Sequence, residues 1–231
     1  MLFESWLSLD YRRRRLLART APGPLHDYLS VPFPSRRADC RATSFVAMDL
    51  ETTGLNAQCD EILSIGIVTV DALQIQLDTA CHYFIRPHQE IPEASAVIHR
   101  ITDDLAQQGE SLADIIALLL HQMAGKVMVA HHARFELNFI NTACLGLFGQ
   151  GFLIPVVDTM SLEQRRRQRA NRVYRAKELR LDALRQAYNL PRYRAHNALS
   201  DALAAAELFI AQIAQIENRK PLPLGDYLMR Y

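Results

Sequence analysis

The chain contains 231 residues, of which 49% are hydrophobic, and it carries a formal net charge of +1 at pH 7. This length predicts one large domain, or one domain with an appendage, and the apolar fraction is sufficient for a substantial core. The near-neutral balance argues against a grossly basic nucleic-acid-binding protein, although it does not describe how the charge is distributed.

The cysteines and the amino terminus together predict a soluble, cytoplasmic protein. The 4 cysteines are dispersed without a Cys-x-x-Cys pair, which disfavours a zinc module or a compact disulfide framework and favours reduced thiols. The amino terminus carries Glu4 and Asp10 where a signal peptide requires positive charge, and it lacks a continuous apolar region. No stretch approaches the roughly 20 apolar residues of a membrane span, so we expect no membrane association.

Residues 1–43 differ from the rest of the chain in their residue pattern and are predicted to form an N-terminal helical, arginine-rich extension. An amphipathic helix is predicted over Leu2–Arg19, with the block Arg12-Arg13-Arg14-Arg15, and Ala21-Pro22-Gly23-Pro24 ends it. The arginine block has two interpretations, contact with nucleic acid or a partner and, more often for a short basic helix, a solvated face. Three side chains of this helix are expected to pack on the main domain: Trp6, Leu7 and Leu9.

Three successive strands are predicted from Ser44 onward, over Ser44–Leu50, Glu61–Asp71 and Gln74–Arg86. Such a run favours an antiparallel start to a sheet. A helix is predicted next over Ser111–Gly125, because Ser111 can cap it and an aspartate follows in the first turn.

The second half alternates strands and helices. A short buried strand is predicted over Lys126–Ala130, a helix over Arg134–Leu147, and another apolar strand before Asp158. Helices then dominate to about Glu217, with an interruption at Asn189-Leu190-Pro191. The order β-β-β-α-β-α-β-α-α predicts an α/β fold with a mixed sheet covered by helices.

Two carboxylates, Asp49 and Glu51, stand at the end of the first predicted strand. Alternate residues of a strand point to the same face, so both side chains are expected to project together. Like charges at this spacing repel, and a fold rarely keeps them without a cation, a proton or a positive partner. A solvated acidic turn is the simpler interpretation of an isolated Asp-x-Glu, and the rest of the chain decides against it.

Two other boundaries between predicted elements carry acid or imidazole groups. In His131-His132-Ala133-Arg134-Phe135-Glu136, a strand passes into a helix that has Glu136 in its first turns. Further on, His196 precedes a helix that carries Asp201, and small residues one turn later would let that helix approach a sheet closely. Sites in open α/β sheets form outside strand ends, so these groups are candidates for one common site.

These segments resemble the motifs of the Asp-Glu-Asp-Asp 3′→5′ exonuclease superfamily, in its histidine-bearing branch. Asp49-Leu50-Glu51-Thr52-Thr53-Gly54-Leu55 is similar to the first motif, and His196-x4-Asp201 is similar to the third. Val97-Ile98-His99-Arg100-Ile101-Thr102 resembles a Val-His-Gly-Ile-Thr segment of that branch, and Leu181-Asp182-Ala183-Leu184 extends the match. The members most resembled are the epsilon proofreading subunit of bacterial DNA polymerase III and ribonuclease T.

The resemblance implies an α/β, ribonuclease H-like fold, with a mixed five-stranded sheet flanked by helices. It covers about Ser44 to Ile216, so we assign residues 44–217 to an exonuclease domain. Residues 1–43 have no counterpart in the common core, and residues 218–231 form a C-terminal tail that is expected to pack on the domain rather than dock elsewhere.

The second motif departs from the family's pattern. It normally reads His-Asn-Ala-x-Phe-Asp, whereas this chain ends the motif with Glu136. Glutamate keeps the charge and the oxygen donors but reaches about one bond further, so direct and water-mediated ligation could trade places. We expect an altered metal preference or rate rather than loss of the site. His131 is expected to orient this motif rather than touch the substrate.

The resemblance implies a site for two divalent metal ions, held by Asp49, Glu51, Glu136 and Asp201. An all-oxygen ligand set suits Mg²⁺ or Mn²⁺ better than zinc. Asp49 would bridge the ions, Glu51 and Asp201 would hold the ion that binds the attacking water, and Glu136 would support the other. His196 would be the catalytic general base, because imidazole titrates near neutrality; the alternative is a surface or capping histidine.

Four further residues are candidate substrate-binding residues: Thr52, Thr53, Leu55 and His99. The threonines could offer hydroxyls or backbone amides near the terminal nucleotide. Leu55 could pack on its base or on the protein core. In the family the equivalent of His99 contacts the nucleotide, and a packing role is equally open.

A positive stretch, Ser161 to Ser200, leads directly to His196. Its acidic residues are only Glu163, Glu178 and Asp182, and its basic residues are Arg165, Arg166, Arg167, Arg169, Arg172, Arg175, Lys177, Arg180, Arg185, Arg192 and Arg194. We expect this surface to bind phosphate chains in a salt-dependent way, with a solvated arginine-rich helix as the alternative.

The motifs predict an exonuclease that releases nucleoside 5′-monophosphates from nucleic acid 3′ ends, with single-stranded DNA favoured. An exoribonuclease of the ribonuclease T type is the alternative. The metal site would contact the phosphate, which DNA and RNA share, so the 2′-hydroxyl that distinguishes RNA must be recognised by other residues. A non-catalytic nucleic-acid-binding or polymerase-interaction module on the same fold is a third reading. Any proofreading role would require a DNA polymerase or another repair partner in trans.

Overall fold

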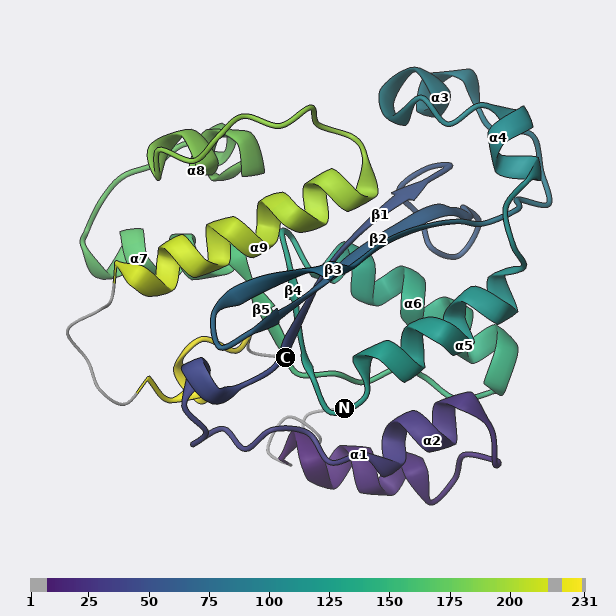
Figure 1. Cartoon of the computed structure of the whole chain (residues 1–231), viewed down its shortest axis with the longest axis horizontal. Coiled ribbons are helices and arrows are strands. Elements are labelled where there is room, and N and C mark those ends of the chain that lie inside the picture. Colours follow the sequence, from purple (N-terminus) through teal and green to yellow (C-terminus); the bar gives the residue numbers. More distant parts are fainter. Residues whose placement is uncertain (1–7, 216–221, 230–231) are drawn as a thin grey trace.

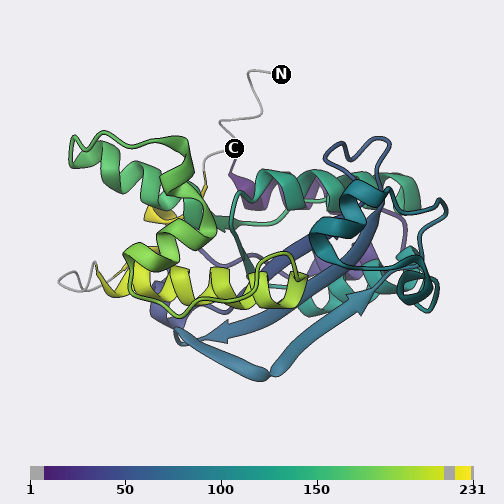
Figure 2. The ribbon, with the colours of Figure 1, turned by 90° about the horizontal axis from the view of Figure 1, so that it is seen from above.

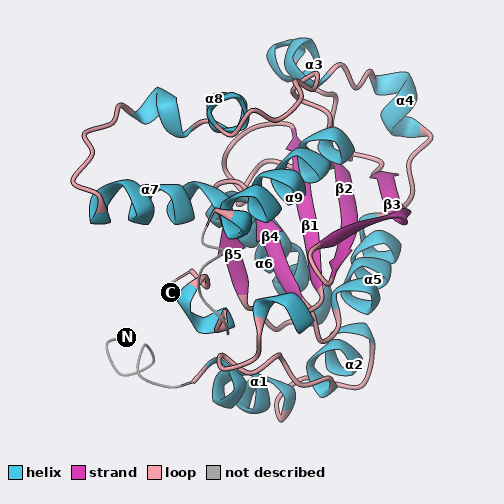
Figure 3. Ribbon diagram, turned by 60° about the vertical axis from the view of Figure 1, so that its left-hand side comes forward, coloured by secondary structure: helices cyan, strands magenta, loops and turns pink. Residues whose placement is uncertain are grey.

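The computed structural model describes residues 8–215 and 222–229, and its centre is a five-stranded mixed sheet (Figures 1 and 3). The strands are β1 (Phe45–Thr52), β2 (Ile62–Asp71), β3 (Gln74–Phe84), β4 (Val127–Ala130) and β5 (Val156–Asp158), in the order β3-β2-β1-β4-β5. β1, β2 and β3 pair antiparallel, whereas β4 runs parallel to β1 and β5 parallel to β4. The predicted fold class and the predicted antiparallel start are both confirmed.

Helices cover both faces of this sheet. The α-helices after β3 are α3 (Glu93–His99), α4 (Asp103–Gln107), α5 (Leu112–Met123), α6 (Arg134–Phe148), α7 (Thr159–Arg169), α8 (Leu181–Ala187) and α9 (Ala198–Ala214). Short 3-10 helices are η2 (Cys40–Ala42), η3 (Ala176–Leu179) and η4 (Leu224–Asp226). No helix within the described residues is long and apolar enough to cross a membrane. Of this set, α3 and α4 were not predicted.

Successive side chains of β1 point to opposite faces, and this alternation separates two hydrophobic clusters. The cluster that includes side chains of α5 and α6 takes Val46, Met48 and Leu50 from β1. The cluster on the face covered by α9 takes Phe45 and Ala47 (Figure 3). By the same alternation Asp49 and Glu51 follow Phe45 and Ala47 onto the α9 face, which is where the third motif lies.

The N-terminal segment contains α1 (Leu9–Leu17) and α2 (Pro24–Ser30). α2 packs on α5, and the Tyr28 hydroxyl donates a hydrogen bond to the carbonyl of Leu153 over 2.8 Å. The buried side chains of α2 are Leu25, Tyr28 and Leu29, all members of the larger hydrophobic cluster. This part of the predicted extension therefore contributes to the core of the domain.

The arginine block of α1 is not a uniformly solvated face. Arg13 is 5% exposed, forms an ion pair with Asp10, and donates to the carbonyl of Leu29 in α2. Its role is therefore to hold α1 on α2. Leu9 packs on the core as expected, whereas Trp6 and Leu7 lie outside the described residues.

Residues 222–229 return to the domain. The carbonyl of Leu222 accepts from the N–H of Cys40 over 2.8 Å, and the N–H of Met229 donates to the carbonyl of Val156 over 2.7 Å. The buried side chains of this segment are Leu222, Leu224, Tyr227 and Leu228. The described part of the tail thus packs on the domain, as we expected of it.

Candidate active site

The first turn of α9 reaches the end of β1 because the neighbouring strand carries a glycine there. Gly66 of β2 pairs with Asp49 of β1. A Cβ at Gly66 would lie 2.1 Å from the carbonyl carbon of Ala198, the first residue of α9. No side chain fits at that distance, so only glycine permits this approach. A lone glycine inside a strand pattern is a sequence signal for such a contact, and our prediction overlooked it.

Asp49, Glu51 and Asp201 converge at this contact. Each offers a carboxylate oxygen, and the three oxygens lie within 4.8 Å of one another. Burial, followed by the charges of Glu136, Asp201 and Glu51, raises the pKa of Asp49 well above its ordinary value. Burial and the charge of Asp201 raise the pKa of Glu51 to about 7. These carboxylates repel one another, and a divalent cation held between them would relieve that repulsion.

Glu136, in the first turn of α6, supplies a fourth carboxylate. Its side chain is buried, and its Oε2 has no hydrogen-bond partner among the described residues. Burial raises the pKa of Glu136 to about 8. The charge of Glu136 in turn raises the pKa of Asp49, so the two groups are neighbours, although Glu136 is not one of the three clustered carboxylates. A buried, unpartnered carboxylate oxygen is an atom that a cation would satisfy.

Asp158, at the end of β5, organises the turn that precedes Glu136. Its Oδ1 accepts from the backbone N–H of His132 over 3.0 Å, and its Oδ2 accepts from the hydroxyl of Ser161 over 2.7 Å. His132 has a φ of 70°, which is uncommon for a residue with a side chain, and this hydrogen bond holds it there. From the sequence Asp158 marked only the end of a strand, although a carboxylate at that point also signals the N-cap that it provides for α7.

His196 lies on the loop before α9 and is exposed. Its φ is 64°, and its backbone N–H donates to Oδ2 of Asp201 over 2.8 Å. The bond spans five residues and ties the backbone of His196 to one carboxylate of the cluster. The third motif is therefore one structural unit.

One cleft of about 990 Å³ contains all five residues predicted as metal ligands or base. They are Asp49, Glu51, Glu136, His196 and Asp201. Basic side chains of Arg180 and Arg192 also line it. A cleft with clustered carboxylates and basic walls is suited to a phosphate-bearing substrate held through metal ions.

The sequence around this cleft matches a known family. Residues 46–209 match the family described as Exonuclease (RNase_T). The chain belongs to the Exonuclease family. This match includes all four carboxylates and the histidine, and it confirms the resemblance found in the motifs.

Relatives of this exonuclease domain include proteins of DNA polymerase III. The chain is 33% identical over 171 residues to the DNA polymerase III subunit epsilon of Treponema pallidum, which covers 74% of this chain and 77% of that subunit. It is 30% identical over 188 residues to the PolC-type DNA polymerase III of Thermotoga petrophila, covering 77% of this chain but only 13% of that polymerase. The solved structure of exonuclease I has the same fold, with a TM-score of 0.65 and 17% identity over 80% of this chain and 43% of that one.

The predicted substrate-binding residues of the exonuclease domain differ in whether their side chains already have partners within the protein. The Thr52 hydroxyl donates to the carbonyl of Gly54 over 2.6 Å, and the Thr53 hydroxyl accepts from the N–H of Glu61 over 2.9 Å. Both threonine hydroxyls therefore shape the turn after β1. Leu55, on the same turn, is 87% exposed and free to meet a ligand.

His99 lies at the end of α3 and lines a smaller cleft of about 210 Å³ that it shares with Glu51 and His196. Its Nδ1 accepts from the N–H of Ile101 over 3.1 Å, so the ring proton sits on Nε2. Burial, then the charge of His196, lowers the pKa of His99. The ring is thus neutral and close to the cluster, and its contact with a nucleotide stays a prediction.

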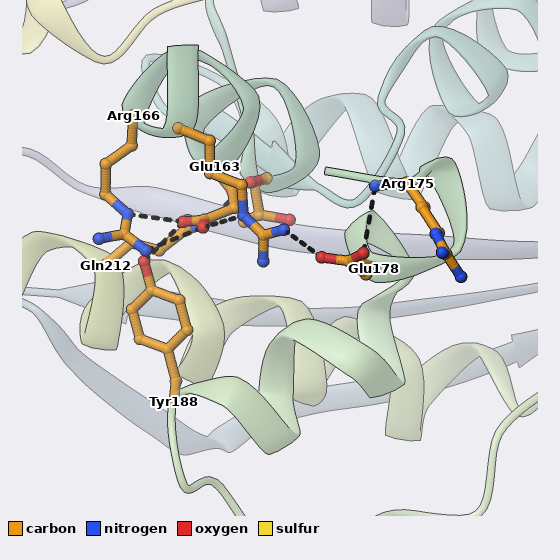
Figure 4. Close-up of polar contacts among 8 residues, drawn as sticks. Glu163, Arg166, Arg175, Glu178, Tyr188 and Gln212 are labelled. Carbon is orange, nitrogen blue, oxygen red and sulfur yellow. Dashed lines mark hydrogen bonds and ion pairs between the residues drawn. The ribbon is translucent and has the colours of Figure 1, made fainter. Parts of the chain in front are cut away.

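Several arginines of the basic stretch are used inside the exonuclease domain. The buried carboxylate of Glu163 in α7 accepts from Arg166 over 2.8 Å, Arg167 over 2.7 Å and the hydroxyl of Tyr188 over 2.9 Å (Figure 4). This network joins α7 to α8, which stand to one side of the sheet (Figure 2). Arg166 and Arg167 therefore have a partner within the domain, and the binding of phosphate chains by this stretch stays a prediction. The exposed cations that line the two clefts are Arg100, Arg180, Arg192 and Arg194.

Proposed function

We propose that the chain is a metal-dependent 3′→5′ exonuclease that hydrolyses phosphodiester bonds at DNA 3′ ends and releases nucleoside 5′-monophosphates. The observation that carries this proposal is the convergence of Asp49, Glu51 and Asp201 within 4.8 Å of one another, in a cleft that also holds His196. Membership of the Exonuclease family supports the same activity.

Asp49, Glu51, Asp201 and Glu136 are proposed to hold two divalent ions, Mg²⁺ or Mn²⁺. Every donor is a carboxylate oxygen, which these hard cations prefer. The raised pKa values of Asp49 and Glu51 and the unpartnered Oε2 of Glu136 fit such a site. When bound, the ions would polarise the scissile phosphate and stabilise the charge that develops on the leaving 3′-oxygen.

His196 is proposed as the general base that takes the proton of the attacking water. It lies on an exposed loop at the wall of the cleft, so water reaches its ring. Imidazole accepts protons at neutral pH, and a base held beside the metal ligands would be in reach of the nucleophile. Loss of the ring should therefore lower kcat more than it raises KM.

DNA is proposed as the substrate, because both polymerase relatives are named as DNA polymerase III proteins. Arg180, Arg192 and Arg194 would bind its phosphates on the way to the cluster. The relative from Treponema pallidum is named as a subunit of DNA polymerase III, and this chain spans only 13% of the PolC-type polymerase. We propose that proofreading, if it is the biological role, uses a DNA polymerase as a partner in trans.

A matched digestion series tests the proposal. Oligonucleotides labelled at the 5′ end are supplied as single-stranded DNA, duplex DNA with a mismatched 3′ end, and RNA, each with Mg²⁺ or Mn²⁺. We expect a ladder of shortened DNA products and free nucleoside 5′-monophosphates, both lost in Asp49→Ala. Faster digestion of RNA would instead identify an exoribonuclease, and binding without hydrolysis by the wild-type chain would identify a non-catalytic module.

A further inference from the structure

The loop between α8 and α9 holds His196 without regular secondary structure of its own. It runs back alongside α9 in both views (Figures 1 and 2). Asn189 and His196, near its two ends, have φ values of 57° and 64°. Within the described residues, the polar anchor of His196 is the backbone bond to Asp201, so the ring depends on the path of the loop.

Arg185 of α8 joins this loop to both flanking helices. Its guanidinium is buried, with 4% of the side chain exposed. Nη1 donates to the carbonyl of Ala204 in α9 over 2.8 Å, and Nη2 donates to the carbonyl of Pro191 in the loop over 2.7 Å. Nη2 also forms an ion pair with Oε2 of Glu207 in α9 over 2.6 Å. One side chain therefore connects three segments.

Tyr193 completes this connection from the loop. Its hydroxyl donates to Oε1 of Glu207 over 2.7 Å, so each carboxylate oxygen of Glu207 has a partner. The ring of Tyr193 lies 4.4 Å from the guanidinium carbon of Arg185, within the range of a cation–π contact. Tyr193 precedes His196 by three residues, a distance of about 10 Å of extended chain at most.

We propose that Arg185, Glu207 and Tyr193 form a latch that sets the position of His196 relative to the carboxylate cluster. The three are positioning residues, which act through His196 and touch no reacting atom. The proposal rests on the general-base role of His196 in the proposed function. A merely structural role would stabilise α8 and α9 without affecting the imidazole.

Tyr193→Phe is the variant that tests the latch, because it removes the bond to Glu207 and keeps the aromatic ring over Arg185. We expect kcat to fall about 10-fold with KM changed less than about twofold, since small displacements of a catalytic group cost rate rather than binding. In histidine-labelled protein, the NMR signals of the His196 ring, assigned by their absence in His196→Ala, should shift or broaden.

A double variant separates positioning from stability. In the His196→Ala background, Tyr193→Phe should cause no further loss of the residual rate, because the group through which it acts is gone. Tyr188→Phe is the matched control: it also removes a tyrosine–carboxylate bond, but Tyr188 is the C-cap of α8 and its bond runs to Glu163 in α7 rather than to Glu207 in α9. We expect Tyr188→Phe to lower thermal stability and to leave the His196 NMR signals and kcat unchanged.

Two results would overturn the latch. One is an equal loss of rate from Tyr193→Phe in the wild-type and His196→Ala backgrounds. The other is a Tyr193→Phe spectrum in which the His196 signals are unmoved. If the wild-type chain hydrolyses no oligonucleotide with either metal, the proposed function fails instead, and the NMR comparison still decides whether the latch holds the ring.

Discussion

The backbone N–H of His196 donates to Oδ2 of Asp201 over 2.8 Å, so the candidate base and a candidate metal ligand are joined within one turn. The same carboxylate contributes an oxygen to the cluster with Asp49 and Glu51. Asp201 therefore holds the backbone of His196 through a hydrogen bond and adds a negative charge to the carboxylate cluster. A substitution that keeps the hydrogen bond but removes the charge separates these two effects.

Asp201→Asn should reduce activity and raise the stability of the metal-free protein. The amide keeps an oxygen that can accept from His196, but it removes one of three mutually repelling charges. We expect kcat to fall by about 100-fold or more, and the melting temperature in chelator to rise by about 2–4 °C per kcal/mol of relieved repulsion. Calorimetry and product release on labelled DNA measure the two effects. Full activity in Asp201→Asn would remove the residue from the site.

The stability of the metal-free protein should fall as the pH rises from about 7 to 9. Burial and neighbouring charge raise the pKa of Glu51 to about 7, and burial raises the pKa of Glu136 to about 8, from an ordinary value of 4.5. The folded chain thus holds protons that the unfolded chain has lost, and this stabilisation disappears as these groups ionise. His131, whose pKa burial lowers to about 4, acts with the opposite sign, but only below its ordinary value of 6.5.

Thermal melts in chelator across this pH range, repeated with saturating Mg²⁺, measure the effect. The metal should flatten the trend because it binds the ionised carboxylates and so removes the advantage of protonation. A melting temperature in chelator that rises with pH over this window would contradict the prediction.

Glu136 should determine which metal supports the reaction best. Glu136→Ala removes the orphaned buried carboxylate and should lower kcat by about 10-fold or more, whereas Glu136→Asp shortens its reach by about one bond. We expect Glu136→Asp to stay active and to change the ratio of rates with Mg²⁺ and Mn²⁺. Rates with each ion, titrated to saturation, give that ratio. Unchanged activity in Glu136→Ala would exclude a role for this carboxylate.

Glu163→Ala should destabilise the domain by about 3 kcal/mol, because it leaves Arg167 and the Tyr188 hydroxyl without their buried partner. Burial alone would raise the pKa of Glu163, but hydrogen bonds from Arg166, Arg167 and Tyr188 outweigh it and lower the pKa. Chemical denaturation measures the loss. Glu178→Ala, which removes a more exposed partner of Arg167, is the control and should change little.

Single-stranded DNA binding should weaken with salt, and the cations at the clefts should account for part of the slope. Arg192→Ala and Arg194→Ala should each reduce the slope of log K against log salt by about 0.7. Arg169→Ala is the matched control, because Arg169 is exposed on α7 but lines neither cleft. Fluorescence anisotropy measures the binding, and an Asp49→Ala background prevents digestion of the DNA during the measurement. Equal affinity at low and high salt would contradict the role of this surface.

Residues whose role depends on local pattern could be predicted from the sequence. The alternation of β1 places Asp49 and Glu51 on one face, and a serine followed by an aspartate marks the start of α5, where Ser111 accepts from the N–H of Asp114. The family resemblance supplied Glu136 and His196, whose importance no periodicity reveals. α3 and α4 were missed because helices of 7 and 5 residues contain too few turns to show a period.

Residues whose role depends on distant partners could not be predicted. Arg185 meets Glu207 across 22 residues of sequence, and Glu163 meets Tyr188 across 25. From composition alone Arg185 is one more positive charge in a basic stretch, and only the packing of α8 on α9 turns it inward. The hydroxyl of Thr52 likewise has a partner that the motif does not reveal, because it donates to the carbonyl of Gly54 in the turn after β1.

The close approach at Gly66 has a consequence for reading activity from related sequences. The site needs a position that carries no side chain at all, opposite Asp49 and under the first turn of α9. A relative could keep every carboxylate and the histidine but carry alanine in place of this glycine. The added Cβ would displace the first turn of α9, and with it the third motif, from the first motif. A sequence comparison that considers only the acidic residues and the histidine would classify such a protein as an active nuclease. The residue at the position of Gly66 would show that it is not.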